Sequence, residues 1–117
     1  MTHLYGINNC DTVKKAKTWL NDKQVNYQFH DYKKEGVDLD FIRQMLETHG
    51  VAVIVNKRGT TYRKLDDAQK STIDSGDINA VALLLQANSS MIKRPIALRD
   101  NASIVGFKAD EYADFFQ

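Results

Sequence analysis

The chain has 117 residues, of which 43% are hydrophobic and 26% charged, and its formal net charge is +1. These values are typical of one globular domain with its own core, and they argue against direct binding to nucleic acid or an anionic membrane. No apolar run approaches the roughly 20 residues of a membrane-spanning helix, and no signal peptide is recognisable. We therefore expect a cytoplasmic protein whose residues 1–117 form a single domain.

Cys10 is the only cysteine, so any disulfide must form with another molecule. It follows a predicted strand, His3–Ile7, and precedes a predicted helix, Asp11–Leu20. A thiol at such a junction lies near the positive end of the helix dipole and near unpaired N–H groups, which favours the nucleophilic thiolate. A reactive and a structural cysteine both remain open, and the junction favours the reactive one.

The middle of the chain alternates strand and helix patterns. Alternating apolar and polar residues over Val25–Phe29 predict a second strand, and Tyr32–Gly36 is typical of a charged turn. A helical stripe over Leu39–Leu46 predicts a helix, with Asp38 as its N-cap and Gly50 as its end. The apolar run Val51–Val55 is short, and a polar loop, Asn56–Thr61, follows it.

The second half predicts two further helices, Leu65–Ile73 and Val81–Leu85, the latter buried on most sides. Ser75–Asp77 separates them. A loop, Asn88–Arg94, leads to the only proline, Pro95.

Two short apolar runs near the end, Ile96–Leu98 and Ser103–Val105, are joined by a turn at Asp100–Ala102. This pattern predicts a hairpin. An amphipathic helix over Ala109–Phe116 follows, and we expect Tyr112 in the core.

The predicted order is strand, helix, strand, a helical insertion, a hairpin and a final helix. This order is typical of an α/β thioredoxin-like fold, with a mixed four-stranded sheet flanked by helices. In that fold the residues after the first strand lie beside those before the third, which would bring Cys10 close to Arg94 and Pro95.

The chain resembles the arsenate reductase (ArsC)/Spx family, and within it the YffB-like branch. The resemblance covers nearly the whole chain and rests on four motifs in this order: Tyr5–Ala16 (YGINNCDTVKKA), Lys57–Leu65 (KRGTTYRKL), Ile92–Pro95 (IKRP) and Val105–Phe107 (VGF). Each motif is weak alone, but their order and spacing together are specific.

The resemblance implies a nucleophilic cysteine, Cys10, and two arginines that bind an oxyanion, Arg58 and Arg94. It also implies a cis peptide bond between Arg94 and Pro95, since X–Pro bonds are the ones for which the cis form costs little.

Four positions depart from the family's arsenate reductases. Gly6 stands where they carry a histidine, and Val13 and Lys14 stand where they often carry serine and arginine. Phe107 replaces a third anion-binding arginine, as in the Spx-like branches. Val13 also removes the second cysteine of the Cys-x-x-Cys switch of Spx regulators, which excludes that switch. Together, the departures at the four positions weaken the case for arsenate reduction.

Other residues near Cys10 are ambiguous. Lys14 either reaches the substrate or belongs to a solvated face, and Asn9 and Thr12 either line an anion-binding loop or cap the helix. Asp11 suits the start of a helix but repels a thiolate. His3, His30 and His49 lie on different elements without metal-ligand spacing, so no metal site is expected.

These observations predict a reductase of an anionic or disulfide substrate, with no bound cofactor. A single thiolate attacks a disulfide sulfur and needs a second thiol for its release; glutathione or another small thiol is the expected co-substrate. Two alternatives remain open: a regulator that contacts RNA polymerase, as the Spx branch does, and an arsenate reductase.

Overall fold

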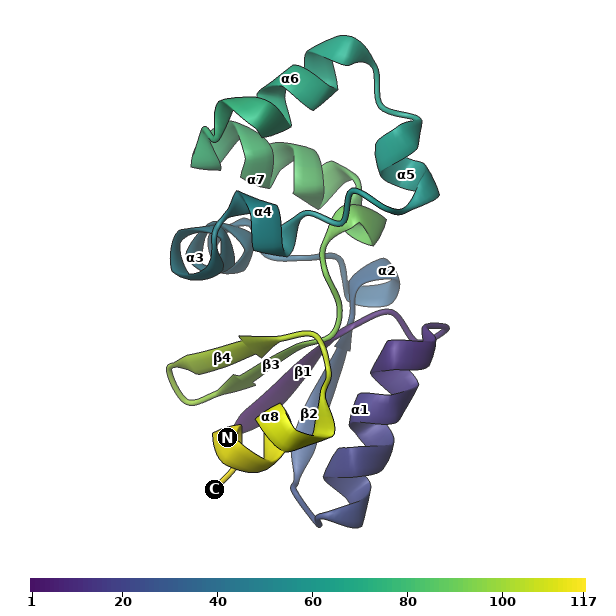
Figure 1. Ribbon diagram of the computed structural model, residues 1–117, viewed down its shortest axis with the longest axis vertical. Coiled ribbons are helices and arrows are strands. Elements are labelled where there is room, and N and C mark those ends of the chain that lie inside the picture. Colours follow the sequence, from purple (N-terminus) through teal and green to yellow (C-terminus); the bar gives the residue numbers. More distant parts are fainter. The chain divides into compact units, whose positions relative to one another are not determined.

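The computed structural model describes residues 1–117 and divides into two compact units (Figure 1). The first, called the sheet unit, comprises Met1–Glu35 and Arg94–Gln117. The second, called the helical unit, comprises Gly36–Lys93. No helix in either unit is long and apolar enough to cross a bilayer.

The sheet unit is built on four strands in the order β2-β1-β3-β4. Their bounds are β1 Thr2–Gly6, β2 Tyr27–Asp31, β3 Ile96–Arg99 and β4 Ala102–Val105. β1 pairs with β2 in parallel and with β3 in antiparallel, and β3 and β4 form the predicted hairpin. The sheet is therefore mixed, as the sequence predicts.

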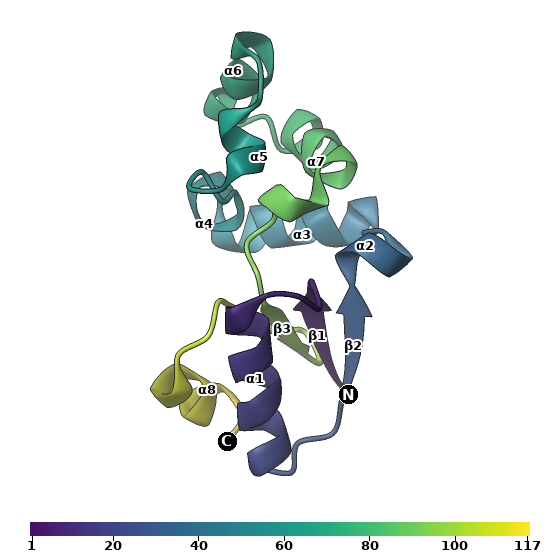
Figure 2. The same ribbon diagram turned by 90° about the vertical axis from the view of Figure 1, so that its right-hand side faces the viewer.

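Two helices, α1 (Asp11–Asp22) and α8 (Ala109–Phe115), cover the same face of this sheet (Figures 1 and 2). They meet because each presents an apolar stripe to alternate strand residues. The fully buried members of this core are Leu4, Ala16, Leu20, Ala97 and Tyr112. Tyr112 thus lies in the core, as predicted.

A short helix, α2 (Tyr32–Glu35), occupies the segment predicted to be a charged turn. The buried carboxylate of Asp31 explains the difference, because its Oδ1 accepts hydrogen bonds from the backbone N–H groups of Lys33 (2.8 Å) and Lys34 (3.3 Å). Tyr32 is only 2% exposed. The charges of the segment are solvated, but its first residue is part of the interior.

The helical unit contains five α-helices and one 3-10 helix. Their bounds are α3 Leu39–His49, α4 Val51–Ile54, α5 Thr60–Arg63, α6 Asp67–Ser75, α7 Ile78–Ala87 and η1 Ser89–Met91. Buried side chains from these helices form its core: Ile42, Met45, Leu46, Ile54, Ile73, Val81, Ala82, Leu85 and Met91.

Polar caps define the helix ends of this unit. Asp38 accepts a hydrogen bond from Phe41 N, and α3 ends at Gly50, as predicted. Asp66 and Gln69 form a reciprocal capping box at the start of α6, and Gly76 ends that helix with a left-handed φ of 73°.

Several boundaries differ from the sequence prediction. β2 begins at Tyr27 rather than Val25, the loop predicted at Asn56–Thr61 runs into α5, and the loop predicted at Asn88–Arg94 contains η1. α7 is longer than predicted, and Leu83 on it is 58% exposed. The apolar composition of α7 therefore overstates its burial.

Candidate functional site

Cys10 lies between β1 and α1 and is the N-cap residue of α1. Its carbonyl accepts the first helical hydrogen bond, from Lys14 N at 3.0 Å, but its side chain caps nothing. The thiol is free and half-buried. The backbone of Cys10 thus starts the helix, while its sulfur makes no structural bond and remains available for chemistry.

The loop before Cys10 is tied to α1 by Lys17. The Lys17 ammonium donates to Asn8 Oδ1 at 2.8 Å and lies 3.6 Å from the centre of the Phe29 ring. Burial lowers the pKa of Lys17, the charge of Lys34 lowers it further, and the carboxylate of Asp31 opposes both. Sequence reasoning missed Lys17; its position two turns into the helix from the loop was the available signal.

Gly6, at the end of β1, is in close contact with α1. A Cβ atom there would lie 2.7 Å from Val13 Cγ2 and 3.8 Å from Arg94 Cβ. Val13 is fully buried, and its branched side chain has little rotamer freedom. The two departures from the family's reductases at Gly6 and Val13 therefore have one structural explanation. The valine side chain fills the space that a side chain at Gly6 would need.

Arg94 lies two residues before β3, the strand that pairs in antiparallel with β1. Tyr5 is opposite Ile96 in the sheet, so the start of β3 lies beside the end of β1, as the predicted fold requires. The Arg94–Pro95 peptide bond is cis, which confirms the sequence prediction. Arg94 is half-buried and its Nε is shielded from solvent.

Tyr32 is a further residue of this region that sequence reasoning missed. Its hydroxyl is buried and has no hydrogen-bond partner. Burial raises the pKa of Tyr32, and the positive charge of Arg94 opposes that rise.

Arg58 belongs to the helical unit, whereas Cys10 and Arg94 belong to the sheet unit. Within its own unit Arg58 lines an open pocket of about 300 Å³ together with two lysines, Lys57 and Lys93. Lys57 is 3.6 Å from Asp74, and the carbonyl of Arg58 accepts a hydrogen bond from Arg63. The Arg58 pocket is thus basic, and a role for it in binding the substrate of Cys10 stays a prediction.

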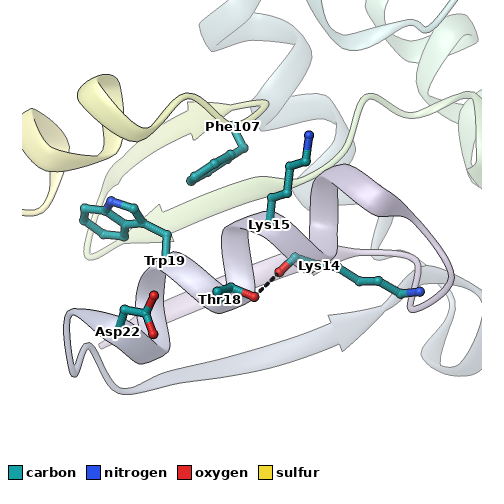
Figure 3. A pocket seen from close by; sticks show the side chains of 6 residues that line it. All are labelled: Lys14, Lys15, Thr18, Trp19, Asp22 and Phe107. Carbon is teal, nitrogen blue, oxygen red and sulfur yellow. Dashed lines mark hydrogen bonds between the residues drawn. The ribbon is translucent and has the colours of Figure 1, made fainter.

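The remaining predicted residues lie at the start of α1. Asn9 and Lys14 are exposed and Thr12 is half-buried. Lys14 also lines an open pocket of about 380 Å³ on the sheet unit, here called the α1 pocket (Figure 3). Its lining residues are Lys14, Lys15, Thr18, Trp19, Asp22 and Phe107. The rings of Trp19 and Phe107 form its apolar side (Figure 3).

The sheet also brings two histidines together that sequence reasoning treated as unrelated. Nδ1 of His3 is 2.8 Å from Nε2 of His30, and Nδ1 of His30 is 3.1 Å from Glu35 Oε1. Tyr5 stacks on His30 with ring centres 4.6 Å apart. Parallel pairing of β1 with β2 brings these three rings together, because Tyr5 is opposite His30 in the register.

Burial and the charge of His30 lower the pKa of His3. The structure contains no group of three or more His, Cys, Asp or Glu side chains placed to hold a metal ion. Hydrogen bonds instead link His3 to His30 and His30 to the carboxylate of Glu35.

The mixed sheet, the helices on it, the cis proline and the cysteine at the start of α1 define a thioredoxin-like fold with a helical insertion. The ArsC family model matches residues 5–115, and the chain belongs to the ArsC family. Its fold is that of the thiol reductases of this family, and arsenate reductases and Spx proteins are homologues.

Similar proteins cover nearly the whole chain. An uncharacterized protein of Haemophilus influenzae is 44% identical over 116 residues, covering 99% of both chains. The solved structure of a protein called YffB is 46% identical, with a TM-score of 0.91 and 97% of both chains covered. The global transcriptional regulator Spx of Staphylococcus epidermidis is 31% identical, covering 98% of this chain and 86% of Spx.

Proposed function

We propose that this protein is a cytoplasmic thiol reductase in which Cys10 is the nucleophile and glutathione the co-substrate. The observation that carries the proposal is the free, half-buried thiol of Cys10, which begins α1 without capping it. A chain with one cysteine has no internal thiol to resolve a mixed disulfide. An external thiol must therefore complete the cycle, and glutathione is the one that we propose.

The reaction has two steps. The Cys10 thiolate attacks one sulfur of a disulfide R–S–S–R′; a bond forms between Cys10 and R–S, the original S–S bond breaks, and R′–S⁻ leaves and takes up a proton. A glutathione thiolate then attacks the R sulfur, forms R–S–S–glutathione and releases the Cys10 thiolate. One disulfide is consumed and one formed, so these two steps release R′–SH at the expense of one glutathione thiol. A second glutathione completes the two-electron reduction when it attacks R–S–S–glutathione, releases R–SH and forms glutathione disulfide.

Five polar side chains that the sequence singled out have a binding role in this scheme. Arg94 offers a planar guanidinium for a carboxylate or an oxyanion. Asn9, Thr12 and Lys14 offer further donors at the start of α1, and Arg58 offers a second guanidinium from the helical unit. Each of them acts on binding, so its removal raises KM more than it lowers kcat.

The decisive experiment replaces the nucleophile. Cys10→Ser should abolish glutathione-dependent reduction of a small model disulfide. Serine is a preferred N-cap residue and the cysteine caps nothing, so the variant should unfold at equal or higher denaturant concentration than the wild type. A folded variant that retains the wild-type rate would contradict the proposal.

Arginine substitutions test the anion site. Arg94→Lys keeps the charge but loses the bidentate fork, and it should raise KM for glutathione by about tenfold, as expected when a charged hydrogen bond is lost. Arg58→Lys tests the second guanidinium in the same way. Arg43→Lys is the matched control, because Arg43 pairs with Asp40 on α3. If Arg94→Lys has the same KM for glutathione as the control variant, Arg94 does not take part in binding glutathione.

A regulatory function is the second candidate, and the similarity to Spx favours it. In that case the protein binds RNA polymerase, and Cys10 is not needed for its action. Co-purification of the wild type and of Cys10→Ser with RNA polymerase distinguishes the two: equal, stoichiometric capture of polymerase by both favours the regulator.

Arsenate reduction is the weakest of the candidate activities. The family's reductases carry a histidine at the position of Gly6, where even a Cβ atom would overlap Val13. Phe107 also stands in place of the third arginine. Wild-type protein should therefore reduce a disulfide in preference to arsenate under the same glutathione concentration.

A further inference from the structure

We propose that the α1 pocket docks an extended polypeptide segment that flanks the disulfide under attack, so that the substrate is a glutathionylated protein rather than a small disulfide. The inference rests on the proposed function and specifies its substrate class. The pocket lies on the helix that Cys10 begins, and all of its lining residues belong to the sheet unit.

The charges of the pocket are ordered along α1. Lys14 and Lys15 lie in the turn nearest Cys10, and Asp22 lies at the far end (Figure 3). The Lys14 side chain extends back toward the N-terminal end of α1 (Figure 3). None of these three residues takes part in an ion pair of the structure. The complementary ligand is acidic close to its reacting sulfur and apolar further away.

The apolar wall is held in place by the core. Phe107 makes an edge contact with Tyr112 at a ring-centre distance of 4.7 Å, and Trp19 contacts the same tyrosine at 5.6 Å. Tyr112 is fully buried, and its hydroxyl donates to the carbonyl of Gly106 at 2.9 Å. Trp19 and Phe107 therefore need little ordering when a ligand binds, which favours affinity.

Distances along the helix set the length of the ligand. A rise of 1.5 Å per residue places Lys14 about 6 Å and Trp19 about 14 Å beyond Cys10 along the helix axis. Glutathione is a tripeptide with cysteine in the middle, and at about 3.5 Å per residue neither arm reaches Trp19. An extended polypeptide reaches Lys14 about two residues and Trp19 about four residues from its cysteine.

The chemistry follows the cycle proposed above. Cys10 attacks the glutathionyl sulfur of a protein–S–S–glutathione bond, the protein thiolate leaves and is protonated, and Cys10 carries glutathione. A second glutathione attacks that sulfur and leaves as glutathione disulfide, regenerating Cys10. The protein is reduced, two glutathione units become one disulfide, and the α1 pocket holds the segment next to the leaving sulfur.

A binding experiment tests the surface without turnover. The probe is the glutathionylated peptide Phe-Gly-Glu-Gly-Cys-Gly-Glu-Gly-Phe, which presents the same spacing in both chain directions; the control peptide has Lys for Glu and Ser for Phe. Trp19 is the only tryptophan, so its emission in the Cys10→Ser protein reports occupancy of the pocket. We expect the probe to bind at least about tenfold more tightly than the control peptide. Equal affinities, or no change in emission, would overturn the proposal.

Variants of the pocket provide the kinetic test. Thr18→Phe fills the pocket from an exposed position of α1, and Lys15→Glu reverses a charge at its rim. Lys23→Glu is the matched control, an exposed lysine at the end of the same helix that does not line the pocket. Both pocket variants should raise KM for the glutathionylated probe by about tenfold, with the control variant unchanged and small-disulfide reduction within about twofold of wild type.

The two proposals fail in different ways. If wild-type protein reduces the small disulfide but both pocket variants keep the wild-type KM for the probe, the docking proposal is wrong and the reductase proposal stands. If Trp19 reports tight, variant-sensitive binding but the wild type reduces neither disulfide, the reductase proposal is wrong, and with it the assignment of the bound segment as a substrate.

Discussion

Single side chains explain why this chain departs from its reductase relatives. The fold brings Gly6 and Val13 into contact across the junction of β1 and α1. Val13 is fully buried, so it belongs to the core as well as to the turn that presents Cys10. A change at either position is transmitted to the other, and the two must be considered together.

A double-mutant cycle measures this coupling. Gly6→Ala introduces a Cβ atom 2.7 Å from Val13 Cγ2 and should lower the free energy of unfolding by about 1–3 kcal/mol, the usual cost of overpacking. In the background of Val13→Ala the same change should cost about 1 kcal/mol less, because contacting residues do not contribute additively. Urea unfolding of the four proteins gives the interaction energy, and additive effects would show that the two positions are independent.

Two buried tyrosines offer a matched comparison of hydroxyl groups. The Tyr32 hydroxyl has no hydrogen-bond partner, whereas that of Tyr112 donates to Gly106 O. Tyr32→Phe should therefore raise the free energy of unfolding by about 1 kcal/mol, while Tyr112→Phe should lower it by about the same amount. Urea unfolding measures both. A loss of stability in Tyr32→Phe would mean that a partner, such as a bound water molecule, satisfies this hydroxyl in solution.

At the scale of elements, periodicity and capping residues were informative where the cause is local. Asp38 and Gly50 delimit α3 because a side-chain cap and a glycine at a positive φ act on their own neighbours. The hairpin of β3 and β4 was likewise predicted from local features, namely two short apolar runs joined by a turn. The helix at Tyr32–Glu35 was missed because its cap, Asp31, is buried and its tyrosine points into the interior; both are tertiary effects.

The same distinction between local and tertiary causes applies to the candidate site. The position of Cys10 between strand and helix was readable from the sequence, as was the cis bond before Pro95 through the family resemblance. The pairing of His3 with His30 and the α1 pocket were not readable, since they depend on strand register and on the contact of Trp19 and Phe107 with Tyr112.

The β1–β2 pair makes stability depend on pH through His3. Burial and the charge of His30 hold the pKa of His3 below its ordinary value of 6.5. In the range just below that value the unfolded chain binds the proton and the folded chain does not, so stability falls as the pH falls. Urea unfolding between about pH 7 and pH 5 should show this loss, and His3→Gln should reduce it. Identical pH slopes in both proteins would contradict the assignment.

At the scale of the whole molecule, the sheet unit is discontinuous in sequence. β1 at its centre needs β3 beside it, and the chain reaches β3 only after passing through the entire helical unit. The helical unit ties its first residues to α7, since Gln86 Nε2 donates to Val37 O, and ties its last residue to α4, since Lys93 N donates to Ile54 O. Folding of the insertion thus shortens the connection between β2 and β3.

We expect the chain to unfold in a single transition for this reason. If the helical unit unfolds alone, the sheet must close a long flexible loop, at a cost of about 3–4 kcal/mol. That cost is a large part of the 5–15 kcal/mol that stabilises an average protein, so loss of the insertion should destabilise the sheet. Trp19 emission follows the sheet unit, and hydrogen exchange of the α7 amides follows the helical unit. Coincident denaturant midpoints are expected of a single domain. An earlier midpoint for α7 would mean that Arg58 is carried by a separately folding unit, and its proposed role in binding substrate would then require that unit to be ordered when substrate binds.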